Sequence, residues 1–276
     1  MRRWLMAVAA VMAVAASAPV TAQRTGEEGV KVGRPSFVRK LVSADKIEQA
    51  ALQQYGQLRE QATSRNVLAP PDDPQARRVR RIADELLPHT HKWNPRAKDW
   101  RWEVVVIKTR AINALCMPGG KIAVFLGLLE TLKLTDDEVA MIIGHEMAHA
   151  LREHARERAA KTTLTNVGAM AVALLIGGNV GELARQSGGL LTLKFSRDDE
   201  KEADLIGMEL AARAGYDPEA GITLWRKMSQ VARGARPQWL STHPSGDTRV
   251  QLIRDNLKDV AGLYARARAN RRPSPN

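Results

Sequence analysis

Aromatic residues and cysteine are both scarce in this 276-residue chain. Phe, Trp and Tyr together make up 4% of the residues, so the core must be built mainly from Leu, Val, Ile, Ala and Met. Cys116 is the only cysteine, which excludes an internal disulfide, and no Cys–His signature surrounds it to indicate a catalytic thiol. We therefore expect Cys116 to be a small, buried residue of a strand.

The chain also lacks an apolar run of about 20 residues, the length that spans a bilayer. Residues 4–16 are apolar but short; they follow Arg2 and Arg3 and precede a small-x-small site that ends at Ala22. This pattern predicts an export signal over residues 1–22, with an uncleaved anchor as the alternative. Because no cysteine lies near the cleavage site, we expect export without a lipid anchor. The predicted location is a bacterial periplasm, and association with the outer membrane stays open.

A strong positive charge is present, but no nucleic-acid-binding motif accompanies it. The formal net charge is +12, and much of the excess lies in the last third of the chain. We interpret it as a solvated basic surface, expect no nucleic-acid partner, and leave peripheral contact with an anionic membrane surface open. The short apolar run at residues 164–176 has two interpretations, a buried or lid helix and an element that dips into a membrane.

The order of the patterns predicts one mainly helical α+β domain over residues 43–263. A polar, glycine-containing segment at 23–42 is expected to be flexible, and 264–276 is expected to be a basic, disordered tail. Three short strands are expected to form a small antiparallel sheet beside the metal-binding helix described next. The predicted strands are 102–108, 111–116 and 121–125, and the predicted helices are 43–63, 75–87, 127–132, 135–161, 196–214, 217–231 and 247–263.

The most informative stretch is 135–154, which reads TDDEVAMIIGHEMAHALREH. It begins with a capping-box pattern and continues with apolar residues, which predicts a buried helix. His145 and His149 are four residues apart, so both imidazoles leave the same helix face and can bind one metal ion. Glu146 lies beside that position and can accept a proton from water. The alternative is a helix with incidental histidines.

A catalytic zinc site needs a third protein ligand from elsewhere in the chain. The stretch 196–204, SRDDEKEAD, offers Glu200 and Asp204 on one helix face. Small residues on that face, Gly207 among them, would let this helix approach the motif helix and bring Glu200 to the metal. Asp204 could then accept a hydrogen bond from the free ring nitrogen of a ligand histidine. The alternative is a solvated acidic helix start, which the helix dipole favours.

Together these motifs resemble the CAAX-prenyl-protease and heat-shock-protease-X family of gluzincin zinc metallopeptidases. The chain is most similar to soluble, periplasmic members, and we expect it to be without the C-terminal helical-repeat domain that some of them carry. The resemblance covers residues 43–263. It rests on H-E-x-x-H at 145–149, S-R-x-x-E-x-E-A-D at 196–204, Asn113-Ala114 with Pro118-Gly119-Gly120, Gly127-Leu128-Leu129, and Thr242-His243-Pro244 with Arg249.

This resemblance implies a zincin-like domain that holds one Zn²⁺ per chain. In the family, the residue at the position of Glu200 is the third zinc ligand beside the two histidines of the motif. The strand at Asn113 and Ala114 is expected to bind an extended substrate by β-addition. Arg249 is expected to be a catalytic cation that stabilises a developing oxyanion. For His243 two roles stay open: a fourth, regulatory metal ligand, or a turn cap before Pro244.

The implied activity is that of a metalloendopeptidase. Glu146 would act as the general base, and the substrates would be unfolded or misassembled envelope proteins, which is a quality-control role. The alternative from another class is a periplasmic chaperone or assembly factor with a latent zinc site. A processing enzyme of narrow specificity is a further alternative.

Overall fold

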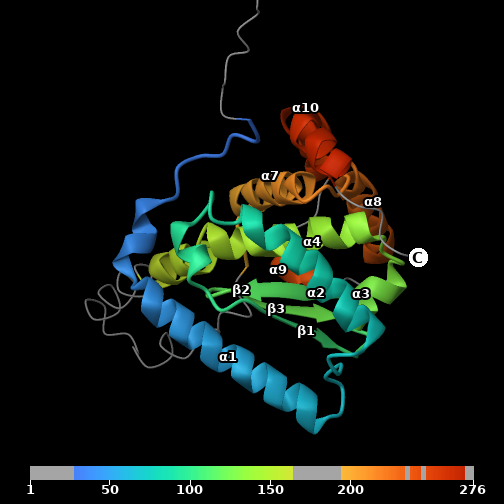
Figure 1. Cartoon of the computed structure of the whole chain (residues 1–276). Coiled ribbons are helices and arrows are strands. Elements are labelled where there is room, and N and C mark those ends of the chain that lie inside the picture. Colours follow the sequence, from blue (N-terminus) through green and yellow to red (C-terminus); the bar gives the residue numbers. More distant parts are fainter. Residues whose placement is uncertain (1–27, 164–193, 234–236, 244–246, 271–276) are drawn as a thin grey trace, which may run out of the picture.

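The computed structural model describes residues 28–163, 194–233, 237–243 and 247–270 (Figure 1). The predicted export signal at 1–22 and the apolar run at 164–176 lie outside the described residues. None of the described helices combines the length and the apolar composition that crossing a membrane requires. The fold class is confirmed: helices predominate around one small sheet.

The elements follow the predicted order closely. Their bounds are η1 Phe37–Leu41, α1 Ala44–Ser64, α2 Pro74–Leu86, η2 Leu87–His89, η3 Pro95–Lys98, β1 Glu103–Ile107, β2 Ala114–Met117, β3 Lys121–Phe125, α3 Leu126–Thr131, α4 Asp136–Leu151, α7 Arg197–Arg213, α8 Ala220–Ala232, α9 Trp239–Thr242 and α10 Asp247–Asn270, with further helical residues at 154–163.

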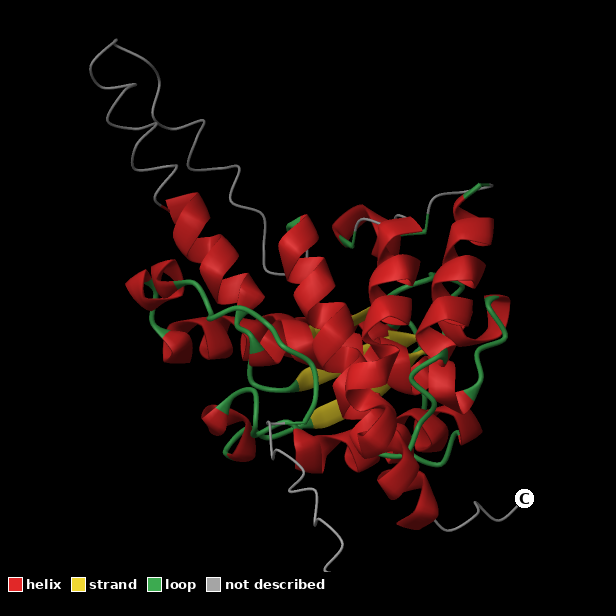
Figure 2. Cartoon of the chain, turned by 90° about the horizontal axis from the view of Figure 1, so that it is seen from above, coloured by secondary structure: helices red, strands yellow, loops and turns green. Residues whose placement is uncertain are grey.

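The sheet is a layer between helices. Strand residues alternate between its faces, so Val106 and Val124 join the core formed with α2 and α4, whereas Val105 and Leu115 pack toward α1. Helix α7 packs on α4, and α10 packs on α7, on the side away from the sheet (Figure 1). Seen from above, helices cover most of the strands (Figure 2).

The sheet is mixed, and the prediction of a purely antiparallel sheet was wrong in this detail. Its order is β1-β3-β2, with β3 parallel to β1 and antiparallel to β2. The tight turn at Gly119 and Gly120, both with positive φ, makes β2 and β3 a hairpin. Local patterns identify such a hairpin, but they do not say which of its strands will pair with β1.

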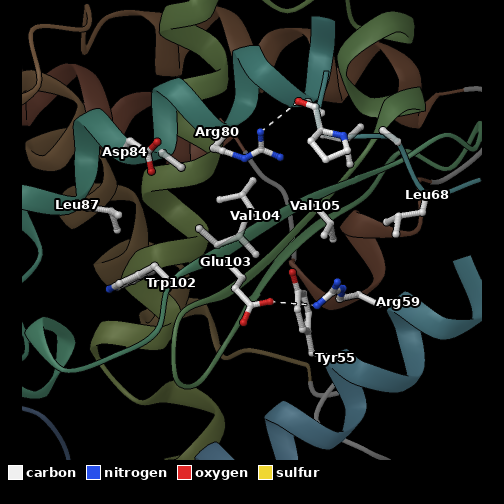
Figure 3. A pocket seen from close by; sticks show the side chains of 16 residues that line it. Tyr55, Arg59, Leu68, Arg80, Asp84, Leu87, Trp102, Glu103, Val104 and Val105 are labelled. Carbon is white, nitrogen blue, oxygen red and sulfur yellow. Dashed lines mark hydrogen bonds and ion pairs between the residues drawn. The ribbon is translucent and has the colours of Figure 1, made fainter. Parts of the chain in front are cut away.

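The two sheet edges have different surroundings. The edge of β1 is partly covered by Leu68 and Ala69, and the rest borders a pocket of about 360 Å³ between α1 and α2. There the ion pair of Arg59 and Glu103 lies beside the Tyr55 ring (Figure 3). The edge of β2 instead borders a cavity that reaches Glu146 on α4 and His243.

Both ends of the described chain are more ordered than the sequence suggested. The prediction of flexibility is wrong for residues 28–42, because Val30 is buried and its N–H donates to Glu209. Residues 264–270, expected to belong to a disordered tail, continue α10. The motif helix is shorter than predicted: α4 ends at Leu151, and helical structure resumes at 154 after Glu153 with a φ of 58°.

Helices α4 and α7 approach each other at two glycines. A Cβ placed on Gly207 would lie 2.6 Å from the His145 nitrogen, and one placed on Gly144 would lie 2.8 Å from the Gly207 oxygen. These neighbours are backbone atoms, which cannot move aside as a flexible side chain can. The predicted close approach through small residues is therefore confirmed, and Gly144 is its counterpart on α4.

We predict that Gly207→Ala separates the two helices and lowers the free energy of unfolding by about 1–3 kcal/mol. The matched control is Gly56→Ala in α1, where an added Cβ meets nothing within 4 Å. There the usual preference for alanine in a helix should raise stability by roughly 0.5–1 kcal/mol. Urea unfolding measures both changes. Equal stabilisation by the two substitutions would contradict the tight contact.

Candidate active site

The two histidines of the motif lie buried on the face of α4 that meets α7. The Nε2 atoms of His145 and His149 are 3.1 Å apart, and both rings are nearly inaccessible to solvent. The capping box of Thr135 and Glu138 begins this helix as predicted. Successive turns of one helix thus direct both imidazoles to the same point.

Helix α7 brings Glu200 to the same point. Its Oε1 lies 3.5 Å from His149 Nε2, and its Oε2 lies 3.6 Å from His145 Nε2. A capping box of Ser196 and Asp199 begins α7, which places Glu200 in the first turn of the helix. This carboxylate is therefore buried in the molecule, and the alternative of a solvated acidic helix start is wrong for Glu200.

His243 completes the cluster from a different part of the chain. It follows α9 directly, and its Nδ1 lies 2.9 Å from Glu200 Oε1 and 3.3 Å from His145 Nε2. Its ring stacks on Trp239 with 4.8 Å between the ring centroids. His243 is therefore held inside the cluster and does more than cap a turn.

The cluster has the composition and dimensions of a zinc site. Its four donor groups, on His145, His149, Glu200 and His243, offer atoms within 4.8 Å of one another. Imidazole and carboxylate donors about 2.0–2.1 Å from a tetrahedral zinc ion lie roughly 3.3 Å from each other. The separations between these atoms in the cluster, from 2.9 to 3.6 Å, agree with that spacing. These residues therefore fit the metal ion that the sequence implied.

Burial sets the protonation of the cluster. It lowers the pKa of His145 and lowers the pKa of His149 well below the ordinary value, so both rings are neutral and can donate a lone pair. Burial lowers the pKa of His243 to about 4 and raises the pKa of Glu200 to about 7. A cationic partner at the centre of the cluster would favour the charged form of Glu200.

Asp204 and Arg249 lie behind the cluster. Asp204 Oδ1 is 3.1 Å from Nδ1 of His145, the interaction expected from the sequence. Burial alone would raise the pKa of Asp204, but Arg249 and the hydrogen bond with His145 outweigh it and lower the pKa. Arg249 donates to Asp204 at 2.6 Å and to Glu200 at 2.5 Å, and it stacks 3.5 Å from the ring centroid of Trp225.

Glu146 lies beside the cluster with its carboxylate held. Trp239 donates its indole N–H to Glu146 Oε1 at 2.6 Å, and His243 Nε2 lies 3.6 Å from the same oxygen. Burial raises the pKa of Glu146, which makes this carboxylate a better proton acceptor than an exposed one. Trp239 thus fixes the direction of Oε1, and Oε2 of Glu146 is the oxygen that can take part in proton transfer.

A cavity of about 280 Å³ opens from Glu146 along the edge of β2. Asn113, Ala114 and Cys116 line one side of it, and Phe195 and His243 line the other. The backbone oxygen of Asn113 accepts a hydrogen bond from β3, so by alternation the backbone groups of Cys116 point away from β3. An extended peptide could pair with that edge next to Glu146. Cys116 lies in strand β2, as predicted, but it is half-buried and not fully buried.

Sequence reasoning missed several residues that support the site. His154 is buried, and its Nδ1 lies 3.0 Å from Nδ1 of His149. Phe195 stacks on His149 with 3.9 Å between ring centroids. Trp239 and Trp225 carried no motif that could have identified them. Glu202 belongs to the matched acidic motif, which was the only available signal for it.

Comparison with known proteins identifies the class. The chain matches the model of Peptidase family M48 over residues 73–257, and it belongs to that family. The family resemblance found in the motifs is therefore confirmed. The donor cluster lies within the part of the chain that the family model matches.

Particular relatives come from two settings. The chain is 38% identical over 173 residues to the mitochondrial metalloendopeptidase OMA1 of Arabidopsis thaliana, a match that covers 62% of this chain and 35% of that protein. It is 30% identical over 199 residues to the metalloprotease LoiP of Escherichia coli, covering 70% and 75% of the two chains. The β-barrel assembly-enhancing protease of Yersinia pestis is 29% identical over 171 residues, covering 56% and 34%. The chain thus spans about a third of the first and third of these relatives.

Replacement of Arg249 tests the charge balance behind the cluster. We predict that Arg249→Gln lowers the free energy of unfolding by about 3–5 kcal/mol, because Asp204 and Glu200 are left as buried carboxylates without their cation. Arg254→Gln, an exposed position on the same helix, is the control and should change stability by less than about 0.5 kcal/mol. Urea unfolding of metal-free protein is the measurement. Similar effects of the two substitutions would show that Arg249 does not balance these charges.

Proposed function

We propose that this chain is a zinc-dependent endopeptidase that cleaves extended segments of protein substrates. The observation that carries the proposal is the buried cluster of His145, His149, Glu200 and His243 beside Glu146, where a cavity opens along the edge of β2. The family and the names of the relatives support hydrolysis of peptide bonds. The cluster supports the choice of metal.

In this proposal His145, His149 and Glu200 hold one Zn²⁺ per chain. A zinc ion bound there would supply Lewis-acid polarisation and would make a water molecule more acidic. Nδ1–H of His145 donates a hydrogen bond to Asp204, so the lone pair on Nε2 of that ring faces the metal position. The neutral state of the two imidazoles supports the same role.

Glu146 is the proposed general base and acid. Its carboxylate, held through Trp239, takes a proton from the attacking water and later gives it to the leaving amine. The raised pKa of Glu146 supports the transfer to the amine, because a weaker carboxylic acid keeps the proton until the leaving amine accepts it. Cys116, also in the cavity, has a pKa that burial raises well above its ordinary value, so the thiol is a poor nucleophile.

The substrate is proposed to lie extended beside β2. Backbone pairing at Ala114 and Cys116 would hold the peptide in a way that depends little on its sequence, and Asn113, whose backbone oxygen bonds to β3, lines the cavity beside them. Such binding suits unfolded chains, whose backbone groups are unpaired.

Arg249 receives a different role from the one that the family resemblance implied. Its guanidinium contacts Glu200 and Asp204 and lies within 3.2 Å of Nδ1 of His145, which is the ring nitrogen opposite the cluster. Arg249 is also not among the residues that line the cavity. We assign it as a positioning residue that holds the two carboxylates, and not as a cation that contacts the substrate.

His243 is proposed as a fourth ligand that keeps the site at rest. Its Nδ1 lies within the cluster, where it would occupy the coordination position that catalysis needs for water. Movement of His243 would open that position. The alternative function, a chaperone with a latent zinc site, corresponds to a His243 that never leaves.

The substrates are proposed to be unfolded or misassembled proteins of a bacterial envelope. The predicted export signal at 1–22 supports this setting, as do LoiP and the β-barrel assembly-enhancing protease among the relatives. The OMA1 relatives are named as mitochondrial proteins, and we do not extend that location to this chain.

The direct test is cleavage of unfolded casein by purified protein. We predict that the Glu146→Gln variant does not cleave casein, because the amide cannot take a proton from water. The variant should still bind one zinc ion. Removal of zinc with a chelator should abolish wild-type cleavage, and added zinc should restore it. Zinc-loaded wild type that cleaves no better than Glu146→Gln, while binding casein, would favour the chaperone alternative.

Replacement of His243 tests the resting state. We predict that His243→Ala raises the initial rate of casein cleavage, because the coordination position for water is then open. His91→Ala, at an exposed site, is the control and should leave the rate unchanged. A lower rate in His243→Ala, with zinc still bound, would instead assign His243 a part in the reaction.

A further inference from the structure

His154 makes an unexpected contact with the second histidine of the motif. Its Nδ1 lies 3.0 Å from Nδ1 of His149, and its ring is buried. In an uninterrupted helix a residue five positions on would point to another face, because each residue turns the helix by about 100°. Here the helix is interrupted at Arg152 and Glu153, and the positive φ of Glu153 redirects the chain. The interruption allows His154 to reach back to His149.

Beyond His154 the contacts continue to a charged pair. His154 Nε2 lies 2.8 Å from Glu202 Oε2, and Arg152 donates to Glu202 Oε1 at 2.6 Å. Arg152 also donates to the backbone oxygen of Gly33, so the N-terminal segment helps to hold it. Arg152 and Glu202 thus form an ion pair, in which Glu202 is a carboxylate.

The position of each proton follows from this arrangement. A carboxylate can only accept hydrogen bonds, so Nε2 of His154 must carry the proton that faces Glu202. In a neutral ring Nδ1 of His154 is then an acceptor, and Nδ1 of His149 must donate to it. This leaves Nε2 of His149 without a proton and directed at the cluster, as metal binding requires.

From these contacts we infer that His154 and Glu202 are positioning residues that fix the tautomer and ring orientation of His149 for metal binding. The inference rests on the proposed zinc site. Asp204 performs this task for His145 by direct contact, whereas Glu202 performs it for His149 through His154. Neither residue contacts the substrate in this scheme.

The test measures zinc affinity by equilibrium competition with a chromogenic chelator. All variants carry Glu146→Gln, so that peptidase activity plays no part in the result. His154→Phe keeps a ring but removes both hydrogen bonds, and we expect it to weaken zinc binding by about 10–100-fold. His154→Gln, whose amide can both accept from His149 and donate to Glu202, should recover most of this loss. The control His91→Phe, at an exposed position, should bind zinc as the parent does.

Glu202 is tested by a matched pair of isosteric changes on α7. Glu202→Gln should weaken zinc binding in the same direction as His154→Phe. Asp198→Asn removes a carboxylate four residues earlier on the same helix. The Asp198 side chain is 90% exposed, so this change should not affect zinc binding. These two variants decide the matter if His154→Phe fails to fold, as judged by near-ultraviolet circular dichroism.

The outcomes separate this inference from the proposed function. If the parent protein binds no zinc, the proposed zinc site itself is wrong. If the parent binds zinc and folded His154→Phe or Glu202→Gln binds it within twofold of the parent, the positioning role is wrong. A loss that His154→Gln does not recover, accompanied by a lower unfolding midpoint of the metal-free protein, would assign His154 a packing role only and would also overturn the inference.

Discussion

The close contact of α4 and α7 is the constraint on which the site depends. One helix carries His145 and His149, and the other carries Glu200 and Asp204, so no complete donor set exists until the two helices meet. Gly144 and Gly207 allow the backbones to approach to distances at which any side chain would collide. The site is thus a consequence of helix packing, and its geometry is as rigid as the core around it.

Because the site is buried, its charged side chains need partners of opposite charge inside the protein. Two carboxylates and three imidazoles share a volume from which water is excluded, and an uncompensated buried charge is costly. Arg249 balances Glu200 and Asp204 from behind, and Trp225 covers its guanidinium. The remaining lone pairs, on the donor atoms of the cluster, point to one position between them. A cation at that position would complete the balance, which gives a physical reason why the polar cluster tolerates burial.

The sequence predicted the parts of the site that rest on local spacing. His145 and His149 share a face at i and i+4, and Glu200 and Asp204 do the same, so the spacing alone defined both pairs. Gly207 could be identified as a contact because small residues allow helices to approach. The start of α4 followed from its capping box. All of these signals are carried by residues close together in the chain.

The other features depend on distant parts of the chain and could not be predicted. The parallel pairing of β1 with β3 depends on which strand is inserted at the centre. The contact of Arg249 with the rear of the cluster depends on where α10 crosses α7. The burial of His154 depends on a helix break at Glu153, a residue that rarely adopts a positive φ and therefore gives no signal in the sequence.

The central claim is that two helices, α4 and α7, and the residue after α9 assemble one metal site from four buried side chains. Anomalous diffraction at the zinc absorption edge, from crystals of the zinc-loaded protein, tests it most directly. We predict a single peak about 2.0–2.1 Å from the Nε2 atoms of His145 and His149, with Glu200 and Nδ1 of His243 also coordinating. A peak at another location, or none at this cluster, would contradict it.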